Sequence, residues 1–359
     1  MRFAYLLSLA AVVQGILSVE CHSLLGQGDL TPPGPPTPSM KTLDQIEARK
    51  PVQSLGSSAS GLYLIAQPGS YYLTGNISGA SGKNGIEIAA SGVTIDLNGF
   101  QLDGQGQGTH AISATTSLAG LVIFNGSVAN WGGKGFSGPI VAQAQLRQLS
   151  ISNCAGGGIL VGSRSLITDC QVDNFGSVGS AVGIAAQSYA RITNCTISNG
   201  QNAADGINVD YGSAVLNTTA GENGGSGIVG QGSFVRIQGC IAFGNKGDGI
   251  RQTGTCTEVV DSIASSNGTG LNQTTSAGIH ILGSNSRVDH SAAFFNAGRG
   301  IAVESGGSNV ITRNSATNNN VGDTGIDYFI APGNRAAVVV SWGGVATGYT
   351  SGDPLANTK

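Results

Sequence analysis

Short apolar segments alternate with glycine and asparagine at a regular spacing along this chain. A glycine followed directly by an apolar residue recurs many times, and an alanine takes the place of the glycine once, before Ile112. The eleven apolar residues of this series lie 24 residues apart on average, and they are Ile86, Ile112, Phe136, Ile159, Ile184, Ile207, Ile228, Ile250, Ile279, Ile301 and Ile326. A fixed period of this length indicates a repeat architecture.

Each repeat also contains a second short apolar segment that is followed by an asparagine. Examples are residues 191–195 before Asn199 and residues 236–240 before Asn245. The apolar runs are two to four residues long and often alternate with polar residues, which predicts β-strands and is too short for helices. Glycine and asparagine tolerate a positive φ angle, so between these runs they predict turns.

A unit of this length with two or three short strands cannot bury its own apolar face, but stacking one unit on the next can. We therefore predict an all-β fold, a right-handed parallel β-helix (solenoid) of about eleven coils with a short N-terminal helix or arm. Equivalent residues of neighbouring coils would lie about 4.8 Å apart. Inward asparagines fit this fold if each hydrogen-bonds its copy in the next coil. A β-propeller or a β-sandwich is the alternative, but both need longer strands and hairpins at shorter intervals.

The composition agrees with a stack of coils and excludes some partners. Apolar residues make up 40% of the 359, which is enough for a buried core, while charged residues make up only 10%. Low charge suits the stack because rows of like charge in neighbouring coils would repel. The net charge of −3 gives no electrostatic signature of binding to nucleic acid or to an anionic membrane.

Composition divides the chain into four segments. Residues 1–23 resemble a signal peptide, because the apolar run Phe3–Leu17 follows Arg2 and is shorter than the roughly 20 residues of a membrane-spanning helix. Residues 24–60 form a proline-rich linker and a short helix at Met40–Lys50, residues 61–335 the β-helix, and residues 336–359 a C-terminal cap and tail. We expect export by this signal peptide to the periplasm, the medium or the cell surface, with no membrane span.

The repeats from about Gly61 to Ile330 resemble those of the pectate-lyase-like superfamily. The segments MKTLDQIE (40–47), QPGSYYL (67–73) and GVTIDLNGF (92–100) resemble uncharacterised secreted bacterial β-helix proteins. The superfamily includes polysaccharide lyases, glycoside hydrolases, uronan epimerases and non-enzymatic surface proteins, so the resemblance does not select an activity. The Asn-Thr-Asp and Gly-His-Gly segments of polygalacturonases and the Asp-Pro-His-Asp segment of uronan epimerases do not occur in the sequence.

Candidate binding residues lie on the outward face of the strands that follow the glycines. If the residue after the glycine points inward, the next residue and the third one point outward. The candidates for substrate binding on these two rows are Asn208, Asp210, Arg251, His280, Glu304 and Asp327. Arg251 would contact a substrate carboxylate, and His280 in the next coil would act as a general acid or base. The 29-residue step between their coils predicts a loop near Ser266–Ser276 beside this face.

Three functions are compatible with these observations. The first is a secreted β-helix protein that binds polysaccharide at the cell surface, the second a polysaccharide lyase or glycoside hydrolase acting on acidic glycans, and the third a structural or adhesive surface protein. The sequence identifies no catalytic residues, does not decide whether the protein is an enzyme, and does not predict the oligomeric state.

We expect neither a cofactor nor a metal, although Asp205, Asp210 and Asp248 are a candidate calcium site. Trp131 and Trp342 are expected to pack in the body rather than to stack on sugars.

Five cysteines follow the signal peptide, namely Cys154, Cys170, Cys195, Cys240 and Cys256. We expect free, inward-facing thiols. The alternative is a disulfide between Cys170 and Cys195, which occupy equivalent positions in adjacent coils and would lie within bonding range.

The cluster Arg287-Val288-Asp289-His290 is a further group of ionisable residues. Strand alternation would point Arg287 and Asp289 one way and His290 the other.

Overall fold

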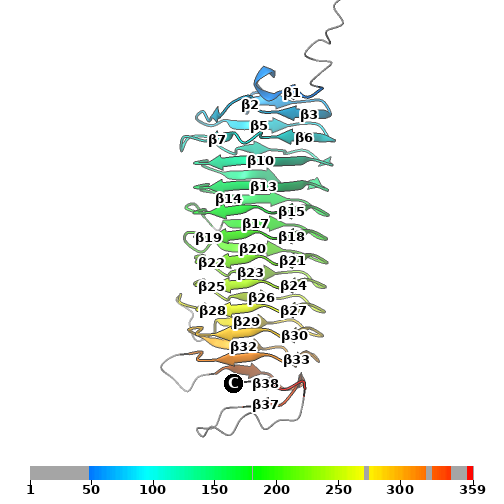
Figure 1. The fold of residues 1–359 in the computed structure, drawn as a ribbon, viewed down its shortest axis with the longest axis vertical. Coiled ribbons are helices and arrows are strands. Elements are labelled where there is room, and N and C mark those ends of the chain that lie inside the picture. The colour runs from blue at the N-terminus through cyan, green and yellow to red at the C-terminus, as the bar shows by residue number, and fades with distance from the viewer. Residues whose placement is uncertain (1–47, 180, 271–274, 321–325, 341–353, 359) are drawn as a thin grey trace, which may run out of the picture. The chain divides into compact units, whose positions relative to one another are not determined.

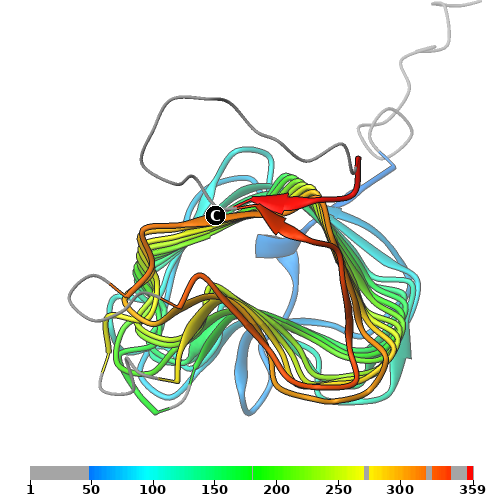
Figure 2. The same cartoon turned by 90° about the horizontal axis from the view of Figure 1, so that it is seen from below.

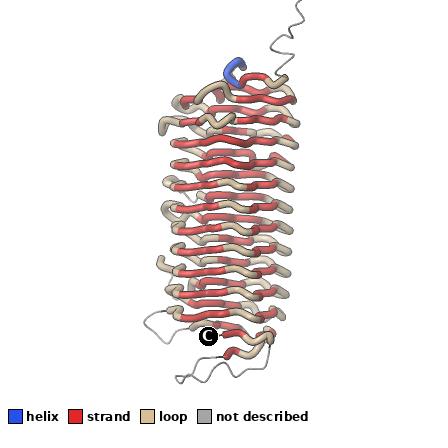
Figure 3. Tube along the Cα trace, viewed as in Figure 1, coloured by secondary structure: helices blue, strands red, loops and turns tan. Residues whose placement is uncertain are grey.

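The computed structural model describes residues 48–179, 181–270, 275–320, 326–340 and 354–358. The predicted signal peptide, most of the helix expected over Met40–Lys50, and Trp342 lie outside the described residues. Residues from Arg49 onward form one compact unit. Short β-strands joined by loops and turns build it, as Figure 3 shows, and one short helix occurs among the described residues, the 3₁₀ turn η1 (Val52–Ser54). The described part of the chain contains no helix with the length and hydropathy needed to cross a membrane.

Twelve coils are stacked on one another, and each contributes one strand to a parallel twelve-stranded sheet (Figure 1). In this first sheet Ile184 pairs with Ile159 on one side and with Ile207 on the other, as the repeat predicts. The strands are β2 (Gly61–Ile65), β5 (Asn84–Ile88), β8 (Ile112–Ser113), β11 (Lys134–Gly138), β14 (Gly157–Val161), β17 (Val182–Ala186), β20 (Asp205–Val209), β23 (Ile228–Gly230), β26 (Ile250–Gln252), β29 (Ala277–Ile281), β32 (Arg299–Val303) and β35 (Tyr328–Ile330). The predicted all-β parallel β-helix is confirmed.

The remaining sides of each coil belong to a second parallel sheet of 24 strands. Its strands form two columns, since β15 pairs with β18 while β16 pairs with β19, and the long strand β13 pairs with both β15 and β16. Viewed along the stack, the coils superpose around one core (Figure 2). The strands of this sheet are β1 (Lys50–Pro51), β3 (Gly69–Tyr72), β4 (Ile77–Ser78), β6 (Val93–Asp96), β7 (Gln101–Asp103), β10 (Val122–Ala129), β13 (Gln145–Ser152), β15 (Leu166–Thr168), β16 (Gln171–Asp173), β18 (Arg191–Thr193), β19 (Thr196–Ser198), β21 (Ala214–Leu216), β22 (Thr219–Gly221), β24 (Arg236–Gln238), β25 (Ile241–Phe243), β27 (Glu258–Val260), β28 (Ile263–Ser265), β30 (Arg287–Asp289), β31 (Ala292–Phe294), β33 (Val310–Thr312), β34 (Ser315–Thr317), β36 (Arg335–Ala336), β37 (Val339–Val340) and β38 (Asn357–Thr358). A separate two-stranded sheet joins β9 (Leu118–Ala119) and β12 (Val141–Ala142).

The ends of the stack differ from the prediction in two ways. An additional coil precedes the first predicted one, because Tyr63 in β2 pairs with Ile86. In the last coil Tyr328, and not Ile326, pairs with Ile301, and Ile326 is 39% exposed. The predicted register of the last coil is therefore wrong by two residues.

A ladder of buried asparagines lies inside the C-terminal half of the stack. Each side-chain amide donates to the side-chain oxygen of the asparagine in the next coil at 2.8–3.0 Å, through Asn223, Asn245, Asn267, Asn296 and Asn319. This confirms the expectation that inward asparagines hydrogen-bond their copies. Such bonds are needed because an unpaired amide in an apolar core costs free energy.

The cysteines are free, as expected, and four of the five are buried. Burial raises the pKa of Cys154 and of Cys240 to about 11. Both thiols are therefore protonated at neutral pH, where the thiol is a weak nucleophile, and they serve as small apolar core groups.

Candidate functional site

The outward row predicted for the first sheet is confirmed where the site lies. Asn208 pairs with Val229, Val229 with Arg251, and Arg251 with His280 in successive strands from β20 to β29. Because the residues flanking each of these along its strand point into the core, these side chains share the outer face of the sheet.

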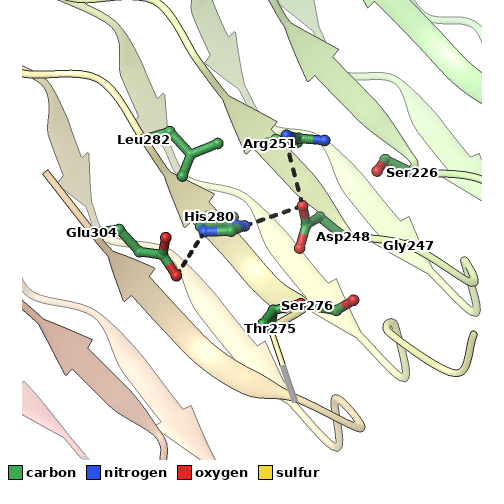
Figure 4. Close-up of a pocket in the computed structure, with 9 residues that line it drawn as sticks. All are labelled: Ser226, Gly247, Asp248, Arg251, Thr275, Ser276, His280, Leu282 and Glu304. Atoms are coloured by element: carbon green, nitrogen blue, oxygen red, sulfur yellow. Dashed lines mark hydrogen bonds and ion pairs between the residues drawn. The ribbon is translucent and has the colours of Figure 1, made fainter. Parts of the chain in front are cut away.

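Arg251, His280 and Glu304 line a cavity of about 370 Å³ on this face (Figure 4). Thr275 and Ser276 also line it, and they belong to the end of the loop predicted near Ser266–Ser276. The full lining consists of Ser226, Gly247, Asp248, Arg251, Thr275, Ser276, His280, Leu282 and Glu304. We refer to it as the Arg251 cavity.

Asp248 is the central acidic group of the Arg251 cavity. It is buried, and one carboxylate oxygen accepts a hydrogen bond from the backbone N–H of Ala277 at 2.7 Å. The other oxygen lies 3.1 Å from Nδ1 of His280 and 3.8 Å from Nε of Arg251. Asp248 therefore orients both the imidazole and the guanidinium, while the Arg251 side chain stays 44% exposed.

His280 is only 7% exposed, and its two ring nitrogens have different surroundings. Nδ1 interacts with Asp248, whereas Nε2 lies 3.4 Å from a carboxylate oxygen of Glu304 and has no hydrogen-bond partner among the described residues. Figure 4 shows the ring between the two carboxylates. A buried polar atom without a partner indicates a position where a ligand group or water completes the site.

Glu304 is held by a second arginine. Arg299 donates to Glu304 at 2.6 Å, and its guanidinium lies 3.8 Å from the centre of the Phe329 ring. The Arg299 side chain is 17% exposed, so this ion pair is better shielded from water than a surface pair. The pair fixes the position of Glu304 relative to His280.

Asp205 is a further acidic group near this face. Its carboxylate accepts the backbone N–H of Ser226 at 2.7 Å. Burial raises the pKa of Asp205, and the nearby negative charge of Asp248 acts in the same direction, whereas the Ser226 hydrogen bond and Arg251 oppose the rise. Asp205 and Asp248 both directly precede the repeat glycine, in the segments Asp-Gly-Ile at 205–207 and 248–250. That recurrence is the signal that would have placed Asp248 in the site.

The other three predicted binding residues do not line the Arg251 cavity. Asn208 lies on the same outer row, and Asp210 is exposed and accepts a hydrogen bond from the Ser188 hydroxyl at 3.4 Å. The predicted outward position of Asp327 is wrong, because Asp327 is buried and accepts the side-chain amide of Asn319 at 2.8 Å. The reason is the register shift of the last coil, which places Asp327 opposite Gly300.

The structure does not bring the candidate calcium ligands into a cluster. No group of three or more His, Cys, Asp or Glu side chains suited to a metal ion occurs in the part of the chain that is described. Trp131 is buried, as expected for a packing residue.

A second cavity, of about 380 Å³, lies on the other sheet and is lined mainly by charged residues, including Arg236, Arg287, Asp289 and His290. The alternation that would separate His290 from Arg287 and Asp289 fails, since His290 has a φ angle of 49° and bends the chain. Arg313 and Arg287 donate to buried Asp289, and the hydrogen bond from Arg313 lowers the pKa of Asp289. These opposite charges satisfy one another, so the cluster is a structural network.

Comparison with known proteins agrees with the fold. The family described as "Right handed beta helix region" matches residues 84–234, 140–291 and 180–346. No curated protein sequence matches significantly.

Among solved structures, the tailspike protein of E. coli bacteriophage HK620 in complex with a pentasaccharide is 12% identical. The match covers 84% of this chain and 66% of that one, with a TM-score of 0.54. The periplasmic alginate epimerase AlgG is 12% identical over 82% of each chain, with a TM-score of 0.46. The A-module of the Azotobacter vinelandii mannuronan C-5 epimerase AlgE6 is 11% identical over 80% of this chain and 99% of that one, with a TM-score of 0.40. The family match spans more than half of the chain and shows that the chain belongs to the right-handed β-helix family.

Proposed function

We propose that the protein binds a polysaccharide in the Arg251 cavity. The observation that carries this proposal is the buried His280, whose Nε2 has no hydrogen-bond partner among the described residues and faces Glu304 beside the exposed guanidinium of Arg251. Arginine, histidine and carboxylate groups together can donate to and accept from sugar hydroxyls. The pentasaccharide bound by the structurally similar tailspike supports a carbohydrate ligand for this fold.

The charges of the Arg251 cavity favour hydroxyl groups over uronate carboxylates as the main ligands. Arg251 interacts with Asp248 and Arg299 with Glu304, so each arginine already has a carboxylate partner. Asp205 adds a further acidic group. A densely anionic chain would meet no net positive charge here, and we therefore propose a neutral or weakly acidic glycan.

The proposed setting is outside the cytoplasm. It rests on the apolar run Phe3–Leu17 behind Arg2, which has the length of a signal-peptide core. An exported β-helix would meet polysaccharide at the cell surface or in the medium.

Replacing Arg251 with alanine should weaken polysaccharide binding by about 1.5–3 kcal/mol, since hydrogen bonds to charged groups contribute about that much. The free energy of unfolding should change by less than about 1 kcal/mol, because the Arg251 side chain is 44% exposed and buried Asp248 keeps its hydrogen bonds with Ala277 and His280. A glycan array with the mature protein identifies the ligand, and calorimetric titration of that ligand measures the loss.

Arg236→Ala is the matched control. Arg236 is 51% exposed, pairs with Glu258 at 3.7 Å and belongs to the second cavity, so its removal should leave binding unchanged. Equal affinity of the wild type and Arg251→Ala for every bound glycan would refute the proposed site.

The Asp248–His280 pair favours a second candidate function, acid–base chemistry on the bound glycan. A carboxylate at Nδ1 fixes the orientation of the imidazole, which leaves Nε2 to exchange a proton with the ligand.

We expect the wild type to shorten the array ligand by hydrolysis or, where the ligand carries uronate units, to desaturate or epimerise them, and His280→Gln to lose this activity while it still binds. Chromatography of the incubated glycan, absorbance of unsaturated products and NMR of the sugar protons measure the outcome. If the glycan is unchanged after incubation, catalysis on that ligand is excluded and binding remains the proposed function.

A further inference from the structure

Three aromatic side chains lie exposed at one turn of three consecutive coils, directly after β17, β20 and β23. Tyr189, Tyr211 and Phe234 are 54%, 39% and 55% exposed. The ring centres are 5.5 Å apart between Tyr189 and Tyr211 and 5.4 Å apart between Tyr211 and Phe234, with edges packed against faces. The Arg164 guanidinium, 5.8 Å from the centre of the Tyr189 ring, extends the row into the preceding coil. We call these three rings the aromatic strip.

The turn that carries the strip does not require aromatic residues. One residue of this turn has a positive φ angle in each of eleven successive coils, and these residues are Gly92, Gly120, Gln143, Arg164, Tyr189, Gly212, Phe234, Cys256, Asn285, Ser308 and Gly333. Glycine and asparagine suit this conformation, whereas bulky side chains adopt it rarely. Tyr189 and Phe234 therefore occupy positions where local preference opposes them and where their rings remain half exposed. Departures of this kind often mark functional surfaces, and here the rings form one contiguous surface over three coils.

In the middle coil the aromatic residue comes one position before the residue with positive φ, and the strip is still continuous. Its positive-φ residue is Gly212, where an added Cβ would lie 2.8 Å from Cδ1 of Tyr189. The ring comes instead from Tyr211, one residue earlier, where the neighbouring coils carry Ser188 and Ser233. Tyr211 thereby fills the space between the other two rings.

Polar groups suited to sugar hydroxyls flank the strip. Gln187, Asp210 and Gln231 are exposed and directly precede the turn in the same three coils. Asp210 accepts a hydrogen bond at 3.4 Å from Ser188, the residue before Tyr189. Sugar rings present apolar C–H faces and hydroxyl edges, and an aromatic surface bordered by amides and a carboxylate matches both.

We propose that the aromatic strip is a second binding surface, separate from the Arg251 cavity, for a neutral glycan chain. The three rings follow one another along the stack at 5.4–5.5 Å, so an extended chain lying along the stack would contact all three, through ring faces and ring edges in turn. The choice of a glycan as the ligand rests on the proposed carbohydrate function, while the position of the surface rests on the rings themselves.

The test compares the wild type with the double variant Tyr189→Asn/Phe234→Asn. Asparagine tolerates the left-handed backbone, so the fold should be preserved. The probes are the hexasaccharides of β-1,4-linked glucose, xylose, mannose and N-acetylglucosamine, titrated calorimetrically. We expect the wild type to bind at least one of them and the double variant to bind it at least tenfold more weakly. Wild-type protein that binds none of the four would overturn the proposal.

Two control variants separate this surface from others. Phe295→Asn removes a ring that is 58% exposed and has a φ angle of 53° at a different turn, so it should leave hexasaccharide affinity unchanged. Equal losses in Phe295→Asn and in the double variant would overturn the proposal. A loss of hexasaccharide affinity in Arg251→Ala but not in the double variant would assign the ligand to the Arg251 cavity and overturn the proposal.

The other partner that the aromatic strip could bind is a second copy of this chain. Sedimentation velocity should show the same oligomeric state for the wild type and the double variant. If the wild type is a dimer and the double variant is a monomer, the aromatic strip is a self-association surface and the glycan proposal is overturned.

Discussion

Trp131→Ala should lower the free energy of unfolding by about 3–5 kcal/mol, the range for removing a large buried aromatic side chain. Trp131 is 1% exposed, and its indole N–H donates to the backbone carbonyl of Leu102 at 3.0 Å. The neighbouring glycines give the indole its space, since a Cβ added at Gly85 or Gly104 would lie within 3 Å of the ring. Truncating the Trp131 side chain would therefore leave a void bordered by backbone atoms, which cannot easily move in to fill it.

Equilibrium unfolding in guanidinium chloride, followed by circular dichroism, measures this loss. Phe295→Ala is the control, because that ring is 58% exposed and its removal should change stability by no more than about 0.5 kcal/mol. A cost below about 1 kcal/mol for Trp131→Ala would show that the first coils contribute little to cooperative stability.

Asn267→Ala should cost about 2–4 kcal/mol, because it interrupts the asparagine ladder in the middle of the stack. The Asn267 side chain donates to Ala242 and Asn296 and accepts from both the backbone and the side-chain N–H of Asn245. Its removal leaves two donors of Asn245 unpaired in the core, and each unpaired buried group costs about 1–3 kcal/mol.

The matched control is Asn208→Ala, on the outer face of the same stack. Asn208 is only half buried, so its replacement should change the unfolding free energy by no more than about 0.5 kcal/mol. If the two substitutions proved equally mild, water would have to replace the missing amide inside the core.

The period of the repeat was sufficient to predict the fold and part of the site. Counting outward positions from the glycine placed Arg251 and His280 on neighbouring strands, as the pairing of β26 and β29 confirms. This works because a one-residue change of register would expose the whole inward row. The same counting began at the glycine and so passed over Asp248, which precedes it.

Sequence reasoning failed where the period itself ends or where a turn replaces a strand. Asp327 was assigned to the outer face because Ile326 continues the glycine–isoleucine series, yet the last coil pairs through Tyr328. The aromatic strip was missed because its three rings belong to a turn whose conformation normally favours glycine or asparagine. Side-chain rings at such positions follow no alternation rule, and only the stacking of coils brings them together.

The asparagine ladder has a direction, and Asp327 ends it. Every side-chain amide along the row donates its N–H to the side-chain oxygen of the asparagine in the following coil, so the hydrogen bonds of the row all point in the same direction. At Asn319 the acceptor is the carboxylate of Asp327, which takes the place of the next amide oxygen. A carboxylate accepts hydrogen bonds but has no N–H with which to continue the chain. The row of side-chain hydrogen bonds therefore ends at Asp327, which offers no amide N–H that could pair with a further coil in the same way.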